Sequence, residues 1–225
     1  MQAILPKLRT IVEHELSCSA HNLDHIDRVL HLCEYLSKGE ADIDTDILTA
    51  AALLHDIARV KEDTDPTGQT DHAVLGAEMA KAILTQLHVP DEKIASIAHC
   101  IQTHRYRTAN PPLTKEAKIL FDADKLDVLG AIGIARSYAI TGEYGEAFYA
   151  DIPLDDYIRE NLTGGVPTGR VKDIAKHATN LEFELKLKHI PEKLHTEKAK
   201  ALALRRVEFM RAYFEELKME IRGEA

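Results

Sequence analysis

The chain has 225 residues, 45% of them hydrophobic and 29% charged, which is ordinary for a soluble globular protein and long enough for one sizeable core. Its net charge of −9 argues against a general nucleic-acid binder, because such proteins present a basic surface. A small phosphorylated substrate is still allowed, since it needs only a local cluster of basic residues.

The cysteines and the N-terminal residues indicate in which cellular compartment the protein is expected. Cys18, Cys33 and Cys100 are an odd number with no CxxC pair, which predicts free thiols in a reducing environment. The opening MQAILPKLRT has no sustained apolar run, and no stretch approaches a membrane span. We therefore expect a cytoplasmic protein with neither a membrane nor a nucleic acid as its partner.

Apolar residues recur at helical spacing along most of the chain, and no stretch alternates strictly enough to predict more than a minor strand. Asp71 and Thr114 are expected helix N-caps, and Pro90 and Pro191 are expected to open helices. The expected fold class is therefore all-α. In chain order the expected helices cover residues 3–16, 22–38, 44–59, 72–88, 91–104, 114–128, 130–141, 172–189 and 193–221.

A loop-like stretch, ENLTGGVPTGR at 160–170, divides the chain. We expect a helical bundle over residues 1–150, and a helical pair over 151–225 that packs on it to give one compact unit. The last helix carries an apolar stripe that packs either on the bundle or on another subunit, so a homodimer is an open alternative. The stripe consists of Leu202, Phe209, Met210, Tyr213, Phe214 and Leu217.

Several polar residues fall on apolar helix faces at 100° per residue. They are His25, His55, His72 and Asp124, with His104 at the edge of its stripe and Asp56 beside His55. One inward histidine is more often a satisfied core residue, and independent buried polar pairs remain the alternative here. Four histidines and two aspartates on five helices instead predict a metal site, because one divalent ion offsets several costly burials. Imidazole and carboxylate ligands without thiolate favour Mn, Fe, Ni, Co or Zn over Mg.

Three segments carry a resemblance to a known family. HNLDHIDRV (21–29), AALLHDIAR (51–59) and FDADKLDVLGAIGIAR (121–136) give the order H…HD…D, which resembles the HD-domain superfamily of metal-dependent phosphohydrolases. The last segment is similar to a bacterial subgroup associated with nucleotide pyrophosphohydrolase activity. The resemblance covers roughly residues 15–150. It implies a bundle of five or more helices in which His25, His55, Asp56 and Asp124 bind one metal ion.

Two further segments bear on the number of ions. DHAVLGAEMAKAIL (71–84) and IQTHRY (101–106) look like the segments that supply additional histidines in binuclear members. His72 and His104 would then bind a second ion, with Asp56 bridging the two. The alternative is that both histidines only contact substrate or water beside a single ion.

The resemblance implies phosphoryl chemistry, which needs positive charge around the reacting phosphate. Arg59, three residues after Asp56, and Lys125, directly after Asp124, are the expected catalytic and substrate-binding cations. Arg28 is a third substrate-binding candidate. For each of the three, a surface or ion-pairing role is the alternative.

Nearby residues have expected supporting roles. Asp127 either orients a ligand histidine or pairs locally. The loops 60–71 and 105–113 are expected to rim the pocket. Cations in these loops, Lys61, Arg105 and Arg107, are expected to guide an anion into it.

The expected function is hydrolysis of a small nucleotide-like phosphate ester or anhydride, with nucleoside triphosphate pyrophosphohydrolysis as one specific form. The HDxxED and GYP wordings are absent, which weakens assignment as an alarmone hydrolase or a cyclic-dinucleotide phosphodiesterase. Two alternatives belong to other classes: a di-iron oxygenase on the same scaffold, and a nucleotide sensor without catalysis.

Overall fold

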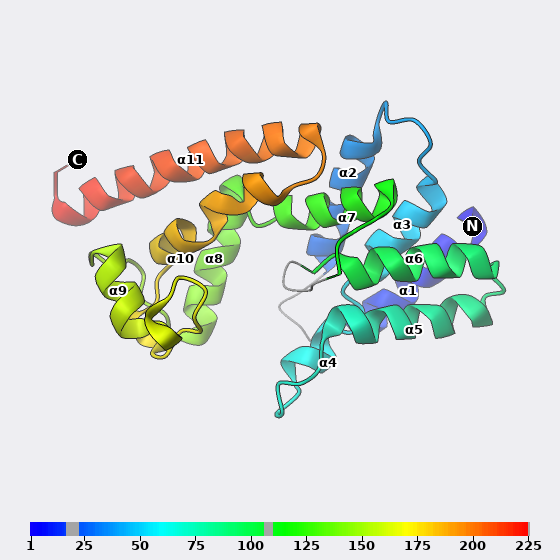
Figure 1. Ribbon diagram of the computed structural model, residues 1–225, viewed down its shortest axis with the longest axis horizontal. Coiled ribbons are helices and arrows are strands. Elements are labelled where there is room, and N and C mark those ends of the chain that lie inside the picture. Colours follow the sequence, from blue (N-terminus) through cyan, green and yellow to red (C-terminus); the bar gives the residue numbers. More distant parts are fainter. Residues whose placement is uncertain (17–22, 106–109, 225) are drawn as a thin grey trace. The chain divides into compact units, whose positions relative to one another are not determined.

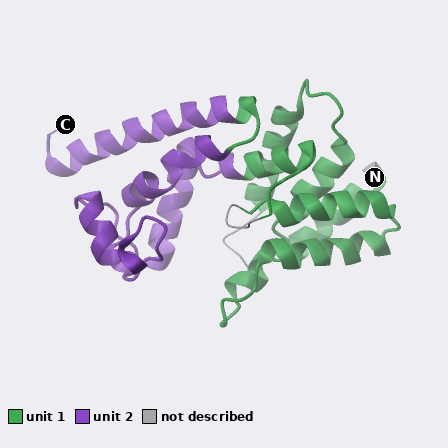
Figure 2. Cartoon of the chain, viewed as in Figure 1, with its two compact units in different colours: residues 1–124, 194–199 green, residues 125–193, 200–225 purple. Residues whose placement is uncertain are grey.

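The computed structural model describes residues 1–16, 23–105 and 110–224 (Figure 1). Contacts divide the chain into two compact units: unit 1 holds residues 1–124 and 194–199, and unit 2 holds 125–193 and 200–225 (Figure 2). Helices dominate both units, and β pairing in the described ranges consists of two isolated bridges. The all-α prediction is confirmed. No helix in these ranges has the length and apolar character needed to cross a membrane.

Unit 1 is built on α3, which packs against α1, α2 and α6. The residues of α3 are buried on nearly every side, as expected for a central helix, and they are Leu48, Ala50, Ala51, Ala52, Leu53 and Leu54. The helices α5 and α6 form an antiparallel pair beside it (Figure 1). The helices of unit 1 are α1 (Leu5–Glu15), α2 (Leu23–Ser37), α3 (Thr45–Leu54), α4 (Arg59–Asp63), α5 (His72–Gln86), α6 (Asp91–Thr103) and most of α7 (Lys115–Leu126).

Unit 2 combines α-helices with shorter 3-10 segments. Its α-helices are α8 (Gly130–Tyr144), α9 (Leu154–Asn161), α10 (Thr179–Leu185) and most of α11 (Glu197–Arg222). The 3-10 segments are Thr163–Gly165, Ile174–Lys176 and Leu187–Lys193. One core cluster holds Tyr157, Leu162, Ala178 and Leu181. Phe183 of α10 packs on Phe214 of α11, with ring centroids 5.1 Å apart.

Most predicted helix starts are confirmed. The Asp71 carboxylate accepts from the backbone N–H groups of Ala73 and Val74 at the start of α5, and the Thr114 hydroxyl accepts from the N–H of Ala117 in α7. Pro90 is the N-cap of α6. Pro191 was expected to open a helix, and this is wrong: it lies inside the 3-10 segment before α11.

The C-terminal part is more broken than predicted. The expected helix 172–189 is interrupted because Ala178 is extended (φ −151°, ψ 156°) and the His177 carbonyl accepts from the N–H of Ala147. The helix α9 was not predicted, although Pro153 precedes it and two aspartates lie in its first turn. The C-terminal part is therefore not a simple helical pair.

The division between units differs from the predicted boundary at residue 150, because α8 packs on α10. In the predicted stripe of α11, Met210, Phe214 and Leu217 are buried, but Phe209 is 53% exposed. The buried face continues instead through Ala199, Ala203 and Val207, at the three- and four-residue steps of one helix face.

Candidate metal centre

Unit 1 brings together the six residues predicted as metal ligands. His25 comes from α2, His55 and Asp56 from the turn after α3, and His72 from the start of α5. His104 is the C-cap of α6, and Asp124 lies on α7. The four histidines and Asp56 are buried. The convergence expected from the helix faces is therefore present.

Asp56 lies between two pairs of histidines. Its Oδ2 is 3.7 Å from Nε2 of His25 and 3.8 Å from Nε2 of His55. Its Oδ1 is 3.4 Å from Nε2 of His72 and 3.6 Å from Nε2 of His104. Within each pair the two Nε2 atoms are 3.2 Å apart. Asp124 adjoins the first pair, with Oδ1 3.4 Å from Nε2 of His25.

These residues make two sets that could each hold a metal ion. We call His25, His55 and Asp56 the first group, and Asp56, His72 and His104 the second group. A transition metal binds such ligands at about 2.0–2.2 Å, which puts neighbouring ligand atoms about 3.0–3.5 Å apart. The observed separations of 3.2–3.8 Å are close to that range, so the donor set fits a metal.

Hydrogen bonds from Nδ1 fix the tautomers of three histidines. Nδ1 of His55 donates to the carbonyl oxygen of Ala52 at 2.8 Å, and Nδ1 of His104 donates to that of Ile101 at 2.6 Å. Nδ1 of His72 donates to the Glu62 carboxylate. Since these oxygens can only accept, we assign the proton to Nδ1, which leaves a lone pair on each Nε2.

The charge state suits a cation. Burial lowers the pKa of His55 to about 4 and also lowers the pKa of His72, so both imidazoles are neutral at pH 7. Burial acts to raise the pKa of Asp56, but the surrounding imidazoles lower it more, so that it lies well below its ordinary value. In the second group, two Nε2 lone pairs face each other without a proton between them. A metal ion would turn this repulsion into coordination.

The HD dipeptide lies in a turn, although the sequence analysis expected a continuous helix over 44–59. The helix α3 ends at Leu54, and α4 starts at Arg59. The His55 ring donates a hydrogen bond to the carbonyl oxygen of Ala52. Backbone hydrogen bonds from residue i to residue i−3 close the turn, among them the bond from the Arg59 N–H to the Asp56 carbonyl oxygen at 2.8 Å. A local side-chain to backbone bond of this kind competes with the helix.

Arg59 and the two rim cations that the structure describes, Lys61 and Arg105, are engaged in ion pairs. Arg59 contacts Asp63 at 3.0 Å and Glu62 at 3.6 Å. Lys61 contacts Glu15 of α1 at 3.0 Å. To guide an anion as predicted, Lys61 would therefore have to release the Glu15 carboxylate.

Arg105 is engaged more fully than Arg59. It contacts Glu62 at 2.8 Å and Asp71 at 3.0 Å. Arg107, the remaining predicted rim cation, and part of the loop 105–113 lie outside the described residues.

The carboxylate that bonds Nδ1 of His72, a predicted ligand, is Glu62, which was not among the residues predicted from the sequence. No spacing rule links Glu62 to His72, and two other acidic residues lie in the same segment, RVKEDTD. Asp127, the predicted candidate for this role, is buried and accepts from Arg136 at 2.6 Å. This is the local pairing given as its alternative.

Two predicted substrate-binding cations are half-buried. Arg28 lies one turn after His25 on α2, and Lys125 follows Asp124 on α7. Their side-chain ammonium and guanidinium groups carry the charge that a phosphate requires.

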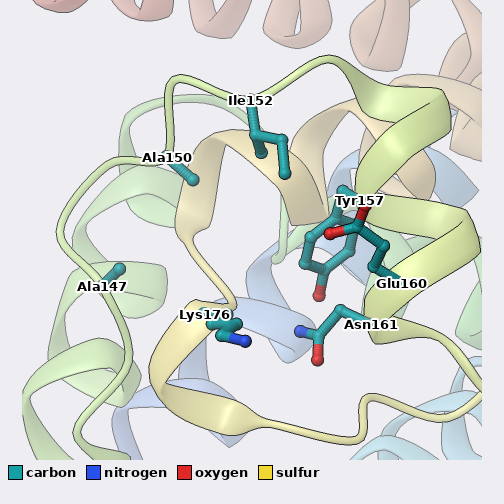
Figure 3. Close-up of a pocket in the computed structure, with 7 residues that line it drawn as sticks. All are labelled: Ala147, Ala150, Ile152, Tyr157, Glu160, Asn161 and Lys176. Carbon is teal, nitrogen blue, oxygen red and sulfur yellow. The ribbon is translucent and has the colours of Figure 1, made fainter.

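A cavity in unit 2 contains none of the predicted ligands. It has a volume of about 240 Å³, and α9, the segment before it and Lys176 line it (Figure 3). Its buried polar groups have partners inside the unit: the Tyr157 hydroxyl bonds Nδ1 of His177 at 2.7 Å, and the Asn161 amide bonds the backbone of Asp173. The histidine–aspartate cluster of unit 1 is therefore the stronger candidate site.

Comparisons with known proteins agree with this geometry. Residues 22–129 match the family model described as HD domain. YpgQ of Bacillus subtilis is 28% identical over 223 residues, which cover 96% of this chain and 93% of YpgQ. The crystal structure of YpgQ in complex with ADP is similar with a TM-score of 0.70 and 27% identity, covering 98% of this chain and 100% of that chain.

Two other relatives extend the comparison. An HD-superfamily hydrolase from Bacillus thuringiensis is similar with a TM-score of 0.71 and 29% identity, covering 98% of each chain. The 3'-5' exoribonuclease YhaM of Bacillus pumilus is 29% identical over 140 residues, which cover 56% of this chain and 44% of YhaM. Residues 22–129 are therefore similar to HD domains, which confirms the predicted resemblance to the HD-domain superfamily.

Proposed function

We propose that the protein is a metal-dependent phosphohydrolase that acts on a small nucleotide. The observation that carries this proposal is Asp56, whose two oxygens face separate histidine pairs. A carboxylate among four imidazole rings is costly to bury without a cation. The similarity to proteins called HD-superfamily hydrolases supports hydrolysis as the reaction class.

We propose two ions in this site. His25, His55, Asp56 and Asp124 would bind the first, and Asp56, His72 and His104 the second. When bound, a divalent metal lowers the pKa of a water molecule and polarises a phosphoryl oxygen. The ligand set favours Mn, Fe, Ni, Co or Zn, because imidazole is a poor ligand for Mg.

Residues beside the ligands would hold the substrate's phosphate. Arg59 is the first candidate, since it follows Asp56 by one turn, and binding a phosphate would replace its contact with Asp63. Lys125 and Arg28 follow Asp124 and His25 closely in the chain and are proposed as further phosphate ligands. Each cation balances negative charge that develops on the phosphate.

A small nucleotide is the substrate class best supported. The crystal structure of YpgQ holds ADP, and YpgQ matches nearly the whole of this chain. YhaM is an exoribonuclease, but this chain matches less than half of it and carries a net charge of −9, which disfavours binding to a long polyanion. Cleavage of a nucleoside triphosphate to release pyrophosphate is the specific form that we propose to test first.

The test combines metal analysis with a substrate screen. We expect about two equivalents of a transition metal in the purified protein. Nucleoside mono-, di- and triphosphates are then incubated with the Mn-loaded protein, and released phosphate and pyrophosphate are measured separately. Pyrophosphate release from triphosphates supports the specific form, and phosphate release from any nucleotide supports the general one.

Other outcomes would contradict the proposal. Binding of ADP without turnover of any nucleotide would point to a sensor. Visible absorption after aerobic oxidation of an iron-loaded sample, with no phosphate release, would point to the oxygenase. Protein that binds no transition metal would remove the basis of the whole assignment.

A further inference from the structure

Glu62 connects a metal-group histidine to the arginines at the rim. Its Oε2 accepts from Nδ1 of His72, and its Oε1 accepts from Arg105 at 2.8 Å. Arg59 is 3.6 Å from the same Oε2 that bonds His72. Glu62 lies on α4 and His72 begins α5, so this carboxylate joins two elements directly beside the second group.

The environment keeps Glu62 charged. Its side chain is 18% exposed and that of His72 is 7% exposed. Arg105 at 2.8 Å and Arg59 at 3.6 Å place positive charge beside this carboxylate. An ionised carboxylate is a stronger acceptor than the backbone carbonyls that bond His55 and His104.

Arg105 supports this arrangement from a second side. Besides Glu62, it contacts Asp71 at 3.0 Å, and Asp71 caps α5, the helix that His72 begins. One guanidinium therefore holds both the carboxylate that bonds the His72 ring and the carboxylate that caps its helix. Arg105 is better explained as part of this support than as a guide for substrate.

We propose that Glu62 is the positioning residue of the second group, holding the proton on Nδ1 of His72 so that Nε2 presents its lone pair to the ion. The inference rests on the proposed second metal ion of the site. Carboxylate–histidine pairs of this kind orient the ring and make the imidazole a stronger donor. Because Glu62 lies on α4, a five-residue helix, the affinity of the second group for its metal ion would depend on the position of that helix.

The tautomer of His72 in metal-free protein is the first test. Two-bond ¹H–¹⁵N spectra of protein labelled at histidine report which ring nitrogen carries the proton, and His72→Gln assigns the signal. We expect the Nδ1–H form in the unsubstituted protein and a population of the Nε2–H form in Glu62→Leu, which has no acceptor. Nε2–H as the main form of the unsubstituted protein would overturn the inference.

Metal affinity is the second test, measured by titrating Mn²⁺ calorimetrically. Glu62→Leu should lower the affinity for the second ion by about 10–100-fold. The affinity for the first ion should not change, which would show that the fold is intact. Glu62→Gln keeps an acceptor and should restore part of the loss. Unchanged affinity in Glu62→Leu would overturn the inference. So would a loss above about a thousandfold, which exceeds the effect of an outer-shell partner and indicates direct coordination.

Asp63→Asn is the matched control, because Asp63 neighbours Glu62 on α4 and contacts Arg59 rather than a histidine. It should change neither the His72 tautomer nor the affinity for the second ion. If the unsubstituted protein takes up only one ion, the proposed second site fails. The tautomer measurement still decides the role of Glu62 in that case.

Discussion

Asp122 and Thr196 are joined by two hydrogen bonds across 74 positions of the chain. The backbone N–H and the hydroxyl of Thr196 both donate to Oδ2 of Asp122 at 2.7 Å, and the N–H of His195 donates to Oδ1 at 2.8 Å. Asp122 is fully buried, so these donors replace its water. They attach residues 194–199, which lead into α11, to α7 within unit 1.

Asp122→Ala should therefore act on stability. Three part-buried donors lose their acceptor, and we expect the free energy of unfolding to fall by about 3 kcal/mol, measured by urea denaturation. Metal content should not change. Asp124→Ala, two residues along the same helix, is the matched comparison and should lower metal content instead. Metal loss in Asp122→Ala at unchanged stability would contradict this division of roles.

Asp56→Asn should remove both metal ions, because one carboxylate serves both groups. We expect hydrolysis to fall by more than the 10–100-fold typical of losing an outer-shell partner. Metal analysis and phosphate release measure the two effects, with Asp63→Asn as the control for a nearby loss of negative charge. Retention of one equivalent of metal by Asp56→Asn would show that the two groups do not depend on a shared ligand.

The stability of the metal-free protein should fall on acidification. Burial lowers the pKa of His55 from 6.5 to about 4, so between these values the unfolded chain binds a proton that the folded chain does not. The free energy of unfolding therefore decreases as the pH falls. The lowered pKa values of Asp56 and Glu62 act in the same direction at lower pH, because their protonation favours the unfolded chain.

The size of this effect can be measured by urea denaturation of metal-free protein at several pH values. From His55 we expect a loss of about 2 kcal/mol between pH 7 and pH 5. His55→Gln should reduce the slope, and His31→Gln, at an exposed position, should not. An equally steep slope in His55→Gln would mean that other groups govern the acid response.

Two glycines of α8 should respond oppositely to alanine. A Cβ at Gly133 would lie 2.3 Å from the carbonyl oxygen of Val128, whereas one at Gly142 would meet nothing within 4 Å. Gly133→Ala forces the backbone to move and should cost about 1–3 kcal/mol. Gly142→Ala should stabilise by about 0.5–1 kcal/mol, because alanine favours the helix. Thermal denaturation of both variants measures the contrast, and equal shifts would contradict the close approach at Gly133.

The sequence was informative where the signal is local or periodic. The helix period placed His25, His72 and Asp124 on inward faces, and the family resemblance supplied the expected order of ligands. Capping preferences also predicted Asp71 and Thr114 correctly as helix N-caps. These predictions depend on residues within one or two turns of each other, so they do not require the fold to be known.

Long-range contacts and local competition explain the misses. The break in the expected helix 172–189 comes from pairing of His177 with Ala147, 30 residues earlier. The end of α3 at Leu54 comes from the His55 ring taking a backbone carbonyl, which periodicity does not detect. Phe209 was predicted within a stripe of six apolar residues, but it is exposed. The buried face of α11 passes through Val207 and Met210, on either side of it.

By itself the sequence determined an all-α chain in which histidines and aspartates of several helices point inward, because helix geometry and apolar spacing are written into neighbouring residues. Only the tertiary structure decided that Asp56 offers one oxygen to each histidine pair, that Glu62 holds the ring of His72, and that Arg105 is bound by carboxylates. The physical reason is that a helix period fixes the face on which a side chain lies. The partner that it meets is fixed by the packing of helices distant in the chain.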